Sequence, residues 1–206
     1  MKKKRTARLP SVRIWKPTKD QILAAYGKRL PDMIAPRMKV LFVGINPGLY
    51  SGAVGHHFAR PGNRFWPVLH KAGFTERQYS PYEERELLKH GYGITNIVNR
   101  ATVSASELSR VELEKGCRRL KAKVRRCRPC LVAVLGLQAF RLAFGQPKAR
   151  FGPQEECIGQ SRLWVLPNPS GLNASYQLPD LSKLFQKVRK SAMCEREKYD
   201  KAMRFR

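Results

Sequence analysis

Two turns in this sequence each place an asparagine beside a proline, directly after a short apolar run. The first follows Leu41-Phe42-Val43 and reads Gly44-Ile45-Asn46-Pro47-Gly48. Glycine allows close approaches that a Cβ forbids, and Pro47 fixes its own φ, so this turn is stiff and open to a ligand. An amide has no useful pKa, so the chemistry available to Asn46 is the placement of a nucleophile more than proton abstraction.

The second turn follows the apolar run Leu163–Leu166 and reads Pro167-Asn168-Pro169-Ser170-Gly171-Leu172. Strands of a parallel sheet bring the loops that follow them to one edge, where ligands bind. We therefore expect the two turns to form the lips of one cleft. Each turn taken alone is also typical of an ordinary loop, and only the pair is specific.

Neither turn has a carboxylate close to it in the sequence. There is no Asp or Glu between Met33 and Thr75, or between Cys157 and Pro179. A carboxylate base would have to fold in from elsewhere, for which Glu107 and Glu112 are the candidates.

The charge of the chain indicates a polyanionic partner. Lys and Arg total 41 against 15 Asp and Glu, a formal net charge of +26, and neutralised phosphates release counterions that drive binding. Nucleic acid is the first expectation and an anionic membrane surface the second. No apolar segment reaches transmembrane length, and the basic N-terminus is not followed by the apolar core of a signal peptide. We expect a cytoplasmic, nucleoid-associated monomer.

The five cysteines do not predict a metal site or a disulfide framework. Cys127 and Cys130 have the spacing of half a metal site. The alternative is a buried helical stripe, because apolar residues recur there at steps of four and three. That stripe consists of Leu113, Cys117, Leu120, Val124 and Cys127. We expect core packing, no metal and no cofactor.

Strand and helix patterns alternate along the chain, which predicts a three-layer α/β/α fold with a mostly parallel central sheet. The predicted strands cover 38–43, 93–98, 130–135 and 162–166, and the predicted helices cover 63–72, 81–90, 109–127, 137–144 and 178–191. A short helix is also expected after Thr18, which has capping-box spacing to Gln21. We divide the chain into a basic tail (1–16), a single domain (17–190) and a charged C-terminal tail (191–206) that we expect to be frayed.

The predicted 109–127 helix has a strongly basic second face. Its members are Arg118, Arg119, Lys121, Lys123, Arg125 and Arg126. A solvated helix face and a DNA-tracking surface are both open interpretations, and the total charge favours DNA slightly.

The chain resembles the bacterial mismatch-specific uracil-DNA glycosylases and the related thymine-DNA glycosylases over about residues 33–189. The residues that carry the resemblance are Gly44–Gly48, Phe58, Asn63–Trp66, Gly93–Arg100, Leu135-Gly136 with Gln138-Ala139, and Leu166–Leu172. The resemblance implies a uracil-DNA glycosylase-like fold and a monofunctional enzyme of base-excision repair. Its expected substrate is uracil, with thymine or ethenocytosine as further candidates, mispaired with guanine in double-stranded DNA. The rivals are a glycosylase of the same fold for another damaged base, and a non-catalytic basic nucleic-acid-binding protein.

The resemblance also assigns the site residues. Asn46 matches the catalytic asparagine that orients the attacking water, and Phe58 matches the aromatic on which the flipped base stacks. Ile45, Ser51 and Asn168 are then expected to contact the base. The DNA wedge is expected at Ser170, Gly171, Leu172 and Asn173, with Leu172 filling the vacated stack.

Four further residues near these motifs have bland interpretations. The bacterial relatives continue the wedge with Ser and Arg, whereas this chain has Asn173-Ala174, so the family's contact to the opposite guanine is not expected from this position. His56 and His57 are expected to be solvated or to reach phosphate or water. Asn63 and Arg64 are expected to hold the motif loop or cap the following helix.

Overall fold

A five-stranded sheet in the order β2-β1-β3-β5-β4 forms the centre of the computed structural model, which describes residues 15–204, with side chains as far as Glu195. The strands are β1 Val40–Gly44, β2 Tyr92–Asn96, β3 Leu131–Leu135, β4 Gly152–Ile158 and β5 Ser161–Leu166. The four predicted strands are confirmed, with bounds that differ by one or two residues. They pair in parallel, as predicted.

The fifth strand, β4, was not predicted. It pairs antiparallel with β5 at the edge of the sheet and alternates between exposed and half-buried residues over most of its length. Pro153 and two glutamates make it a poor strand by composition, but an edge strand tolerates both.

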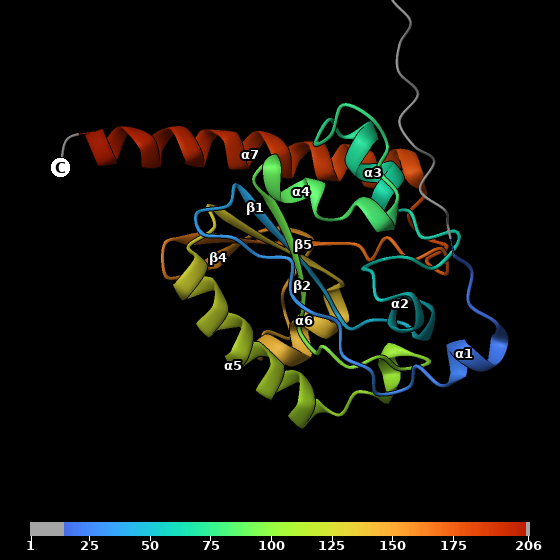
Figure 1. Ribbon diagram of the computed structural model, residues 1–206. Helices are drawn as coiled ribbons and strands as arrows, with labels where there is room; N and C mark the ends of the chain where they lie inside the picture. Colours follow the sequence, from blue (N-terminus) through green and yellow to red (C-terminus); the bar gives the residue numbers. More distant parts are fainter. Residues whose placement is uncertain (1–14, 205–206) are drawn as a thin grey trace, which may run out of the picture.

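Helices cover both faces of the sheet (Figure 1). On one face lie α3 Phe65–Lys71, α4 Glu86–Lys89 and the long α7 Leu178–Arg204, and on the other lie α5 Arg110–Cys127 and α6 Leu137–Phe144. The predicted three-layer α/β/α fold is therefore confirmed. Two short helices, α1 Lys19–Leu23 and α2 Leu49–Val54, pack against each other beside the loop that follows β1.

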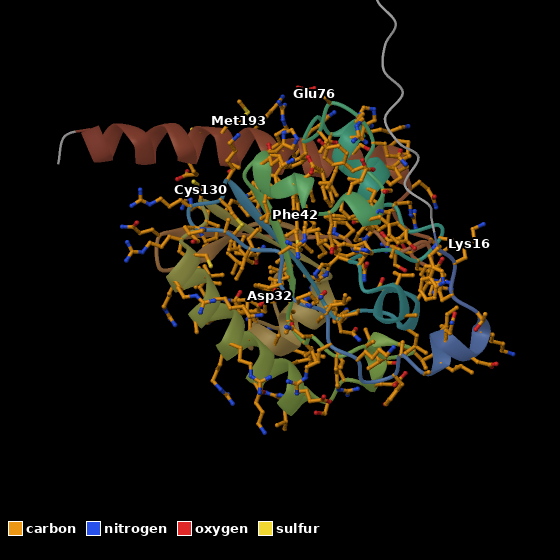
Figure 2. The ribbon with its side chains drawn as sticks, viewed as in Figure 1. Lys16, Asp32, Phe42, Glu76, Cys130 and Met193 are labelled. Atoms are coloured by element: carbon orange, nitrogen blue, oxygen red, sulfur yellow. The ribbon has the colours of Figure 1, made fainter. Side chains whose placement is uncertain are left out.

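Each face has its own apolar core. Phe42, at the centre of the body in Figure 2, stacks on Phe185 of α7 with ring centroids 5.7 Å apart. On the other face, all five residues of the predicted α5 stripe are buried. Cys117 and Cys127 thus belong to the core between α5 and the sheet. Burial in apolar surroundings also raises the pKa of the Cys117 thiol.

Several local expectations need correction. The predicted loop after β1 contains α2, and the predicted 81–90 helix is a 3₁₀ turn, Pro81–Glu83, followed by α4. The charged tail expected after residue 191 continues α7 to Arg204. It extends beyond the body in Figure 1. The capping box at Thr18 is confirmed.

Of the predicted basic tail (1–16), residues 1–14 lie outside the described residues. In the described part of the chain, no helix is long and apolar enough to cross a bilayer.

Candidate active site at the carboxyl edge of the sheet

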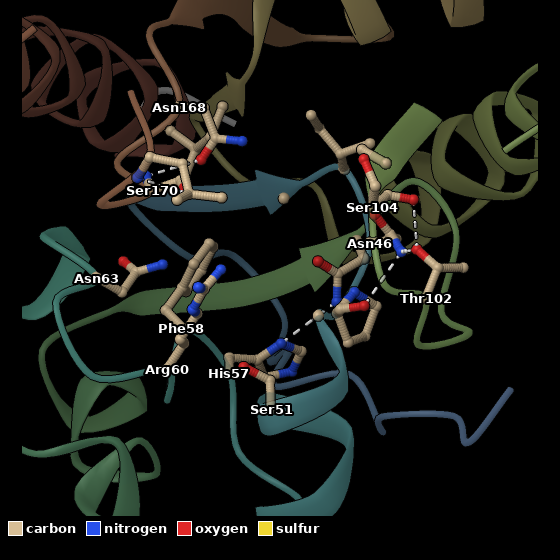
Figure 3. Close-up of a pocket in the computed structure, with 18 of the residues that line it drawn as sticks. Asn46, Ser51, His57, Phe58, Arg60, Asn63, Thr102, Ser104, Asn168 and Ser170 are labelled. Carbon is tan, nitrogen blue, oxygen red and sulfur yellow. Dashed lines mark hydrogen bonds between the residues drawn. The ribbon is translucent and has the colours of Figure 1, made fainter. Parts of the chain in front are cut away.

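A cleft of about 410 Å³ opens where β1, β2, β3 and β5 end. From β1 the chain proceeds to β2 on one side, and later places β3 on the other, so the cleft lies at a topological switch point. Both asparagine–proline turns contribute to its lining, as predicted. The expected site residues that line it are Ile45, Asn46, Ser51, Phe58, Asn168, Ser170, Leu172 and Asn173 (Figure 3).

The side-chain amide of Asn46 is held by its nitrogen. Nδ2 donates to the carbonyls of Pro47 and Arg100, at 3.1 and 3.3 Å, and to Thr102 Oγ1 at 2.6 Å. Oδ1 accepts no hydrogen bond from the described part of the chain. The amide therefore presents an acceptor to the cleft, as a group that orients water requires.

Thr102 decides that orientation. Its hydroxyl donates to the carbonyl of Ser104 at 2.8 Å, so its oxygen faces Asn46 as an acceptor and requires the NH₂ end of the amide. Its backbone N–H donates to Pro47 at 3.1 Å, and its side chain is 1% exposed. The sequence analysis missed this residue because it lies in an irregular segment with no motif of its own.

Phe58 is held in a strained backbone conformation. Its φ is 53°, the left-handed region that a phenylalanine rarely adopts. One face of its ring stacks on Phe65, with centroids 4.1 Å apart and an interplanar angle of 24°, while the residue also lines the cleft. Gly44 makes room for it, since a Cβ there would lie 3.3 Å from Phe58 Cζ and 2.4 Å from Asn96 Oδ1. The arrangement leaves an aromatic platform fixed from behind.

Ser51 fastens the segment that carries Phe58. Its hydroxyl accepts a hydrogen bond from the Ala59 N–H at 3.1 Å, and the residue is buried at the cleft wall. It links α2 to the loop that follows it.

His57 is buried, contrary to the expectation of a solvated loop histidine. It is 2% exposed, and Nε2 donates to the Pro31 carbonyl at 2.9 Å. Nδ1 then accepts from Asn96 Nδ2 at 3.3 Å, which is the pattern of a neutral ring. Burial lowers the pKa of His57 below its usual value, and nearby Glu84 opposes that shift in part. Asn96 also lines the cleft and was not singled out from the sequence.

His56 is only partly exposed and pairs with a carboxylate. Its Nδ1 donates to Glu84 Oε1 at 2.9 Å, and the other oxygen of that carboxylate accepts the His57 N–H. Glu84 thereby holds the His56-His57 segment from behind.

The second lip of the cleft is held by its own asparagines. Asn168 Oδ1 accepts the Ser170 N–H at 3.0 Å, and Asn173 Nδ2 donates to the Asn168 carbonyl at 2.9 Å. Leu172, at the tip, is 76% exposed. Gly171 faces another backbone, because a Cβ there would lie 2.6 Å from the Gly62 carbonyl oxygen.

Arg64 clamps this lip to α3. Its guanidinium donates to the carbonyls of Ser170 and Asn173, both at 2.6 Å, and to that of Tyr176. Asn63 Oδ1 accepts the Phe65 N–H at 2.9 Å, at the start of α3. Both residues therefore have the structural roles predicted for them.

No carboxylate in the described part of the chain lines the cleft. Glu107 Oε1 accepts the Ser104 N–H, and Glu112 makes a two-point contact with Arg100, at 2.7 and 3.0 Å. This contact lowers the pKa of Glu112 to about 2. Neither candidate base therefore reaches Asn46.

The basic face of α5 is partly neutralised. Lys121 pairs with Glu156 at 2.9 Å, and Lys123 pairs with Asp32 at 2.7 Å. The four arginines of that face are exposed. These contacts do not decide between a solvated face and a DNA-tracking surface.

Comparison with known proteins gives one family and one similar fold. A family model described as the uracil DNA glycosylase superfamily matches residues 31–192. Among solved structures, the chain is similar to the solution NMR structure of a "putative Uracil DNA glycosylase" from Methanosarcina acetivorans. The TM-score is 0.55 at 16% sequence identity, and the match covers 79% of this chain and 98% of that one. At that identity the similarity shows the fold.

Proposed function

Because the chain belongs to the uracil DNA glycosylase superfamily, we propose that it hydrolyses the N-glycosidic bond of uracil mispaired with guanine in duplex DNA. Thymine and ethenocytosine opposite guanine are the further substrates of this proposal. The enzyme acts as a monomer without a cofactor in base-excision repair, on DNA of the cytoplasmic nucleoid. Its product is an abasic site in an uncut strand.

The observation that carries the proposal is the orientation of Asn46. With Nδ2 occupied by three acceptors, Oδ1 is the end that remains for a water molecule. A water held there is placed beside any base that rests on the free face of Phe58. Placement converts attack on the anomeric carbon into an effectively unimolecular step and needs no strong base.

The remaining parts of the cleft fit a flipped nucleotide. Phe58 supplies a fixed stacking platform, and such base–aromatic contacts are worth about 1–3 kcal/mol. Leu172 is exposed at the opposite lip, where it can fill the gap left in the stack. No lysine lines the cleft in the described part of the chain, which favours water over an amine nucleophile.

The side chain of Asn173 is used inside its own loop. Nδ2 donates to the Asn168 carbonyl and Oδ1 accepts the Ser175 N–H at 3.2 Å. We therefore assign the recognition of the opposite guanine to the backbone around Leu172, which has no such internal role.

The test is base release from defined duplexes. Wild type is incubated with duplexes that carry G:U, G:T, A:U or guanine opposite ethenocytosine, and alkali then cuts at abasic sites. We expect release from G:U first, and none from Asn46→Ala, which keeps nearly full DNA affinity in gel-shift titration. Wild type that binds these duplexes but releases no base from any of them contradicts the proposal. An Asn46→Ala variant that cleaves at the normal rate contradicts the site assignment.

A further inference from the structure

A second cavity lies on the other side of the segment that follows β2. Its volume is about 430 Å³, and α5 forms one of its walls. The charged residues that line it are Arg29, Arg100, Lys115, Arg119 and Lys123, together with Asp32 and Glu112. Five cations around two carboxylates leave this concave site with an excess of positive charge.

Two of the five cations have carboxylate partners. Arg100 is paired with Glu112, and Lys123 with Asp32, which lies in the lower part of the body in Figure 2. Arg29, Lys115 and Arg119 are exposed, and the described part of the chain gives them no hydrogen-bond or ion-pair partner. Three donors are therefore available to a ligand at the rim.

The backbone holds these cations close together at a cost in stability. Arg29 lies directly opposite Arg100 in an antiparallel bridge, where like charges repel. Lys115, Arg119 and Lys123 follow one another at i,i+4 spacing along α5, which is also unfavourable for like charges. A bound anion relieves both repulsions.

The wall of the cavity is fixed by a close helix contact. Gly116 of α5 also lines the cavity, and a Cβ on it would lie 2.3 Å from the Ile97 carbonyl oxygen. The segment from Arg29 is tied to the opposite wall, where the Leu30 N–H donates to the Asn99 carbonyl at 3.2 Å. The cations are thus displayed on a backbone that is already in place, which lowers the cost of ordering a ligand.

We propose that this cavity binds a phosphate group, held by Arg29, Lys115 and Arg119. Arginine and lysine are the side chains that recognise phosphate oxygens, through charge-assisted hydrogen bonds. The source is either a phosphodiester of bound DNA or a free phosphate anion, and the two arms of the experiment separate them. The proposal does not depend on uracil hydrolysis, because the cavity is separate from the cleft that holds Asn46.

The experiment compares two double variants of the full chain. The test variant is Lys115→Gln/Arg119→Gln, and the matched control is Arg118→Gln/Arg125→Gln. Both remove two exposed cations from α5 and replace them with a good helix former, but neither control residue lines the cavity. Thermal unfolding checks that both variants fold.

The first arm titrates inorganic pyrophosphate into each protein by calorimetry without DNA. The second arm measures binding to an undamaged duplex at several salt concentrations, so that neither arm needs glycosylase activity. A free phosphate ligand predicts pyrophosphate affinity about tenfold lower in the test variant than in the control. A DNA phosphodiester predicts a salt slope reduced by about 0.9 for each lost phosphate contact, in the test variant alone. Equal behaviour of test and control variants in both arms overturns the proposal.

Discussion

Thr102 Oγ1 lies 2.6 Å from Asn46 Nδ2 and donates its own hydrogen to the Ser104 carbonyl. The hydroxyl thereby acts as an acceptor toward Asn46 and sets which end of the amide faces the cleft. A residue that follows β2 thus controls a residue that follows β1, through a contact that spans 56 positions of sequence.

Thr102→Val should lower the rate of uracil release with little change in DNA affinity. The change removes the hydroxyl and lets the Asn46 amide turn, so its water is misplaced; a loss of about tenfold or more is expected. Single-turnover rates on a G:U duplex measure it. Thr102→Ser keeps the hydroxyl and is the control. Equal rates for the Val and Ser variants would show that this contact does not position Asn46.

Leu172→Ala should slow release more on a well-paired A:U duplex than on G:U. The exposed side chain fills the vacated stack, and its loss matters more where more unstacking energy must be supplied. Single-turnover rates of wild type and variant on both duplexes decide this. A variant impaired equally on both, or on neither, would make Leu172 a loop-packing residue.

Arg64→Lys should loosen the second lip of the cleft. One ammonium cannot reach the three carbonyls that the guanidinium serves, so we expect a loss of about 1–3 kcal/mol in unfolding free energy. Hydrogen exchange of residues 170–177 should become faster. Arg60→Lys, a cleft-lining arginine on the neighbouring loop, is the control. Unchanged exchange in Arg64→Lys would mean that other contacts hold the lip.

His57 should make the protein less stable as the pH falls below about 6.5. Its pKa is lowered in the folded state, so the unfolded chain binds the proton first and stability rises with pH in this range. The contribution is fully present above pH 6.5 and is lost toward the folded pKa. Urea unfolding at pH 7.5 and 5.5 should show a smaller difference in His57→Gln than in wild type. His70→Gln, at an exposed position of α3, should keep the wild-type difference. If His57→Gln keeps it too, the ring is not buried in its neutral form.

Glycosylase activity should survive treatment with a chelator. Cys117 and Cys127 lie in the core beside α5, so they are not arranged on an open surface to receive a metal. The measurement is release from G:U with and without chelator, together with elemental analysis of the purified protein. Stoichiometric iron or zinc would contradict the prediction.

The apolar runs and the helical stripe predicted most of the sheet and α5, because periodicity reports directly which side chains are buried. β4 escaped because an edge strand needs little apolar sequence. The extent of α7 escaped because its last turns continue through a charged segment, where no burial pattern marks a helix.

The candidate site was predictable where one loop presents one residue. Asn46 and Leu172 stand in turns with a recognisable composition, and both line the cleft. Thr102 and Asn96 become part of the cleft only when β2 pairs with β1, which no local pattern reveals. His57 has the sequence neighbourhood of a solvated residue, and its burial depends on Pro31, 26 positions away.

The contact between Gly171 and the Gly62 carbonyl makes the width of the cleft mouth a property of the main chain. Two backbones meet there with no side chain between them, so residue replacements around the cleft alter its chemistry but not the separation of its lips. New substrate ranges in this scaffold would therefore arise from insertions or deletions in the two loops, or from changes deeper in the pocket, before they arise from substitutions at the rim. Gly171→Ala would not tune the enzyme, because it would force the mouth open.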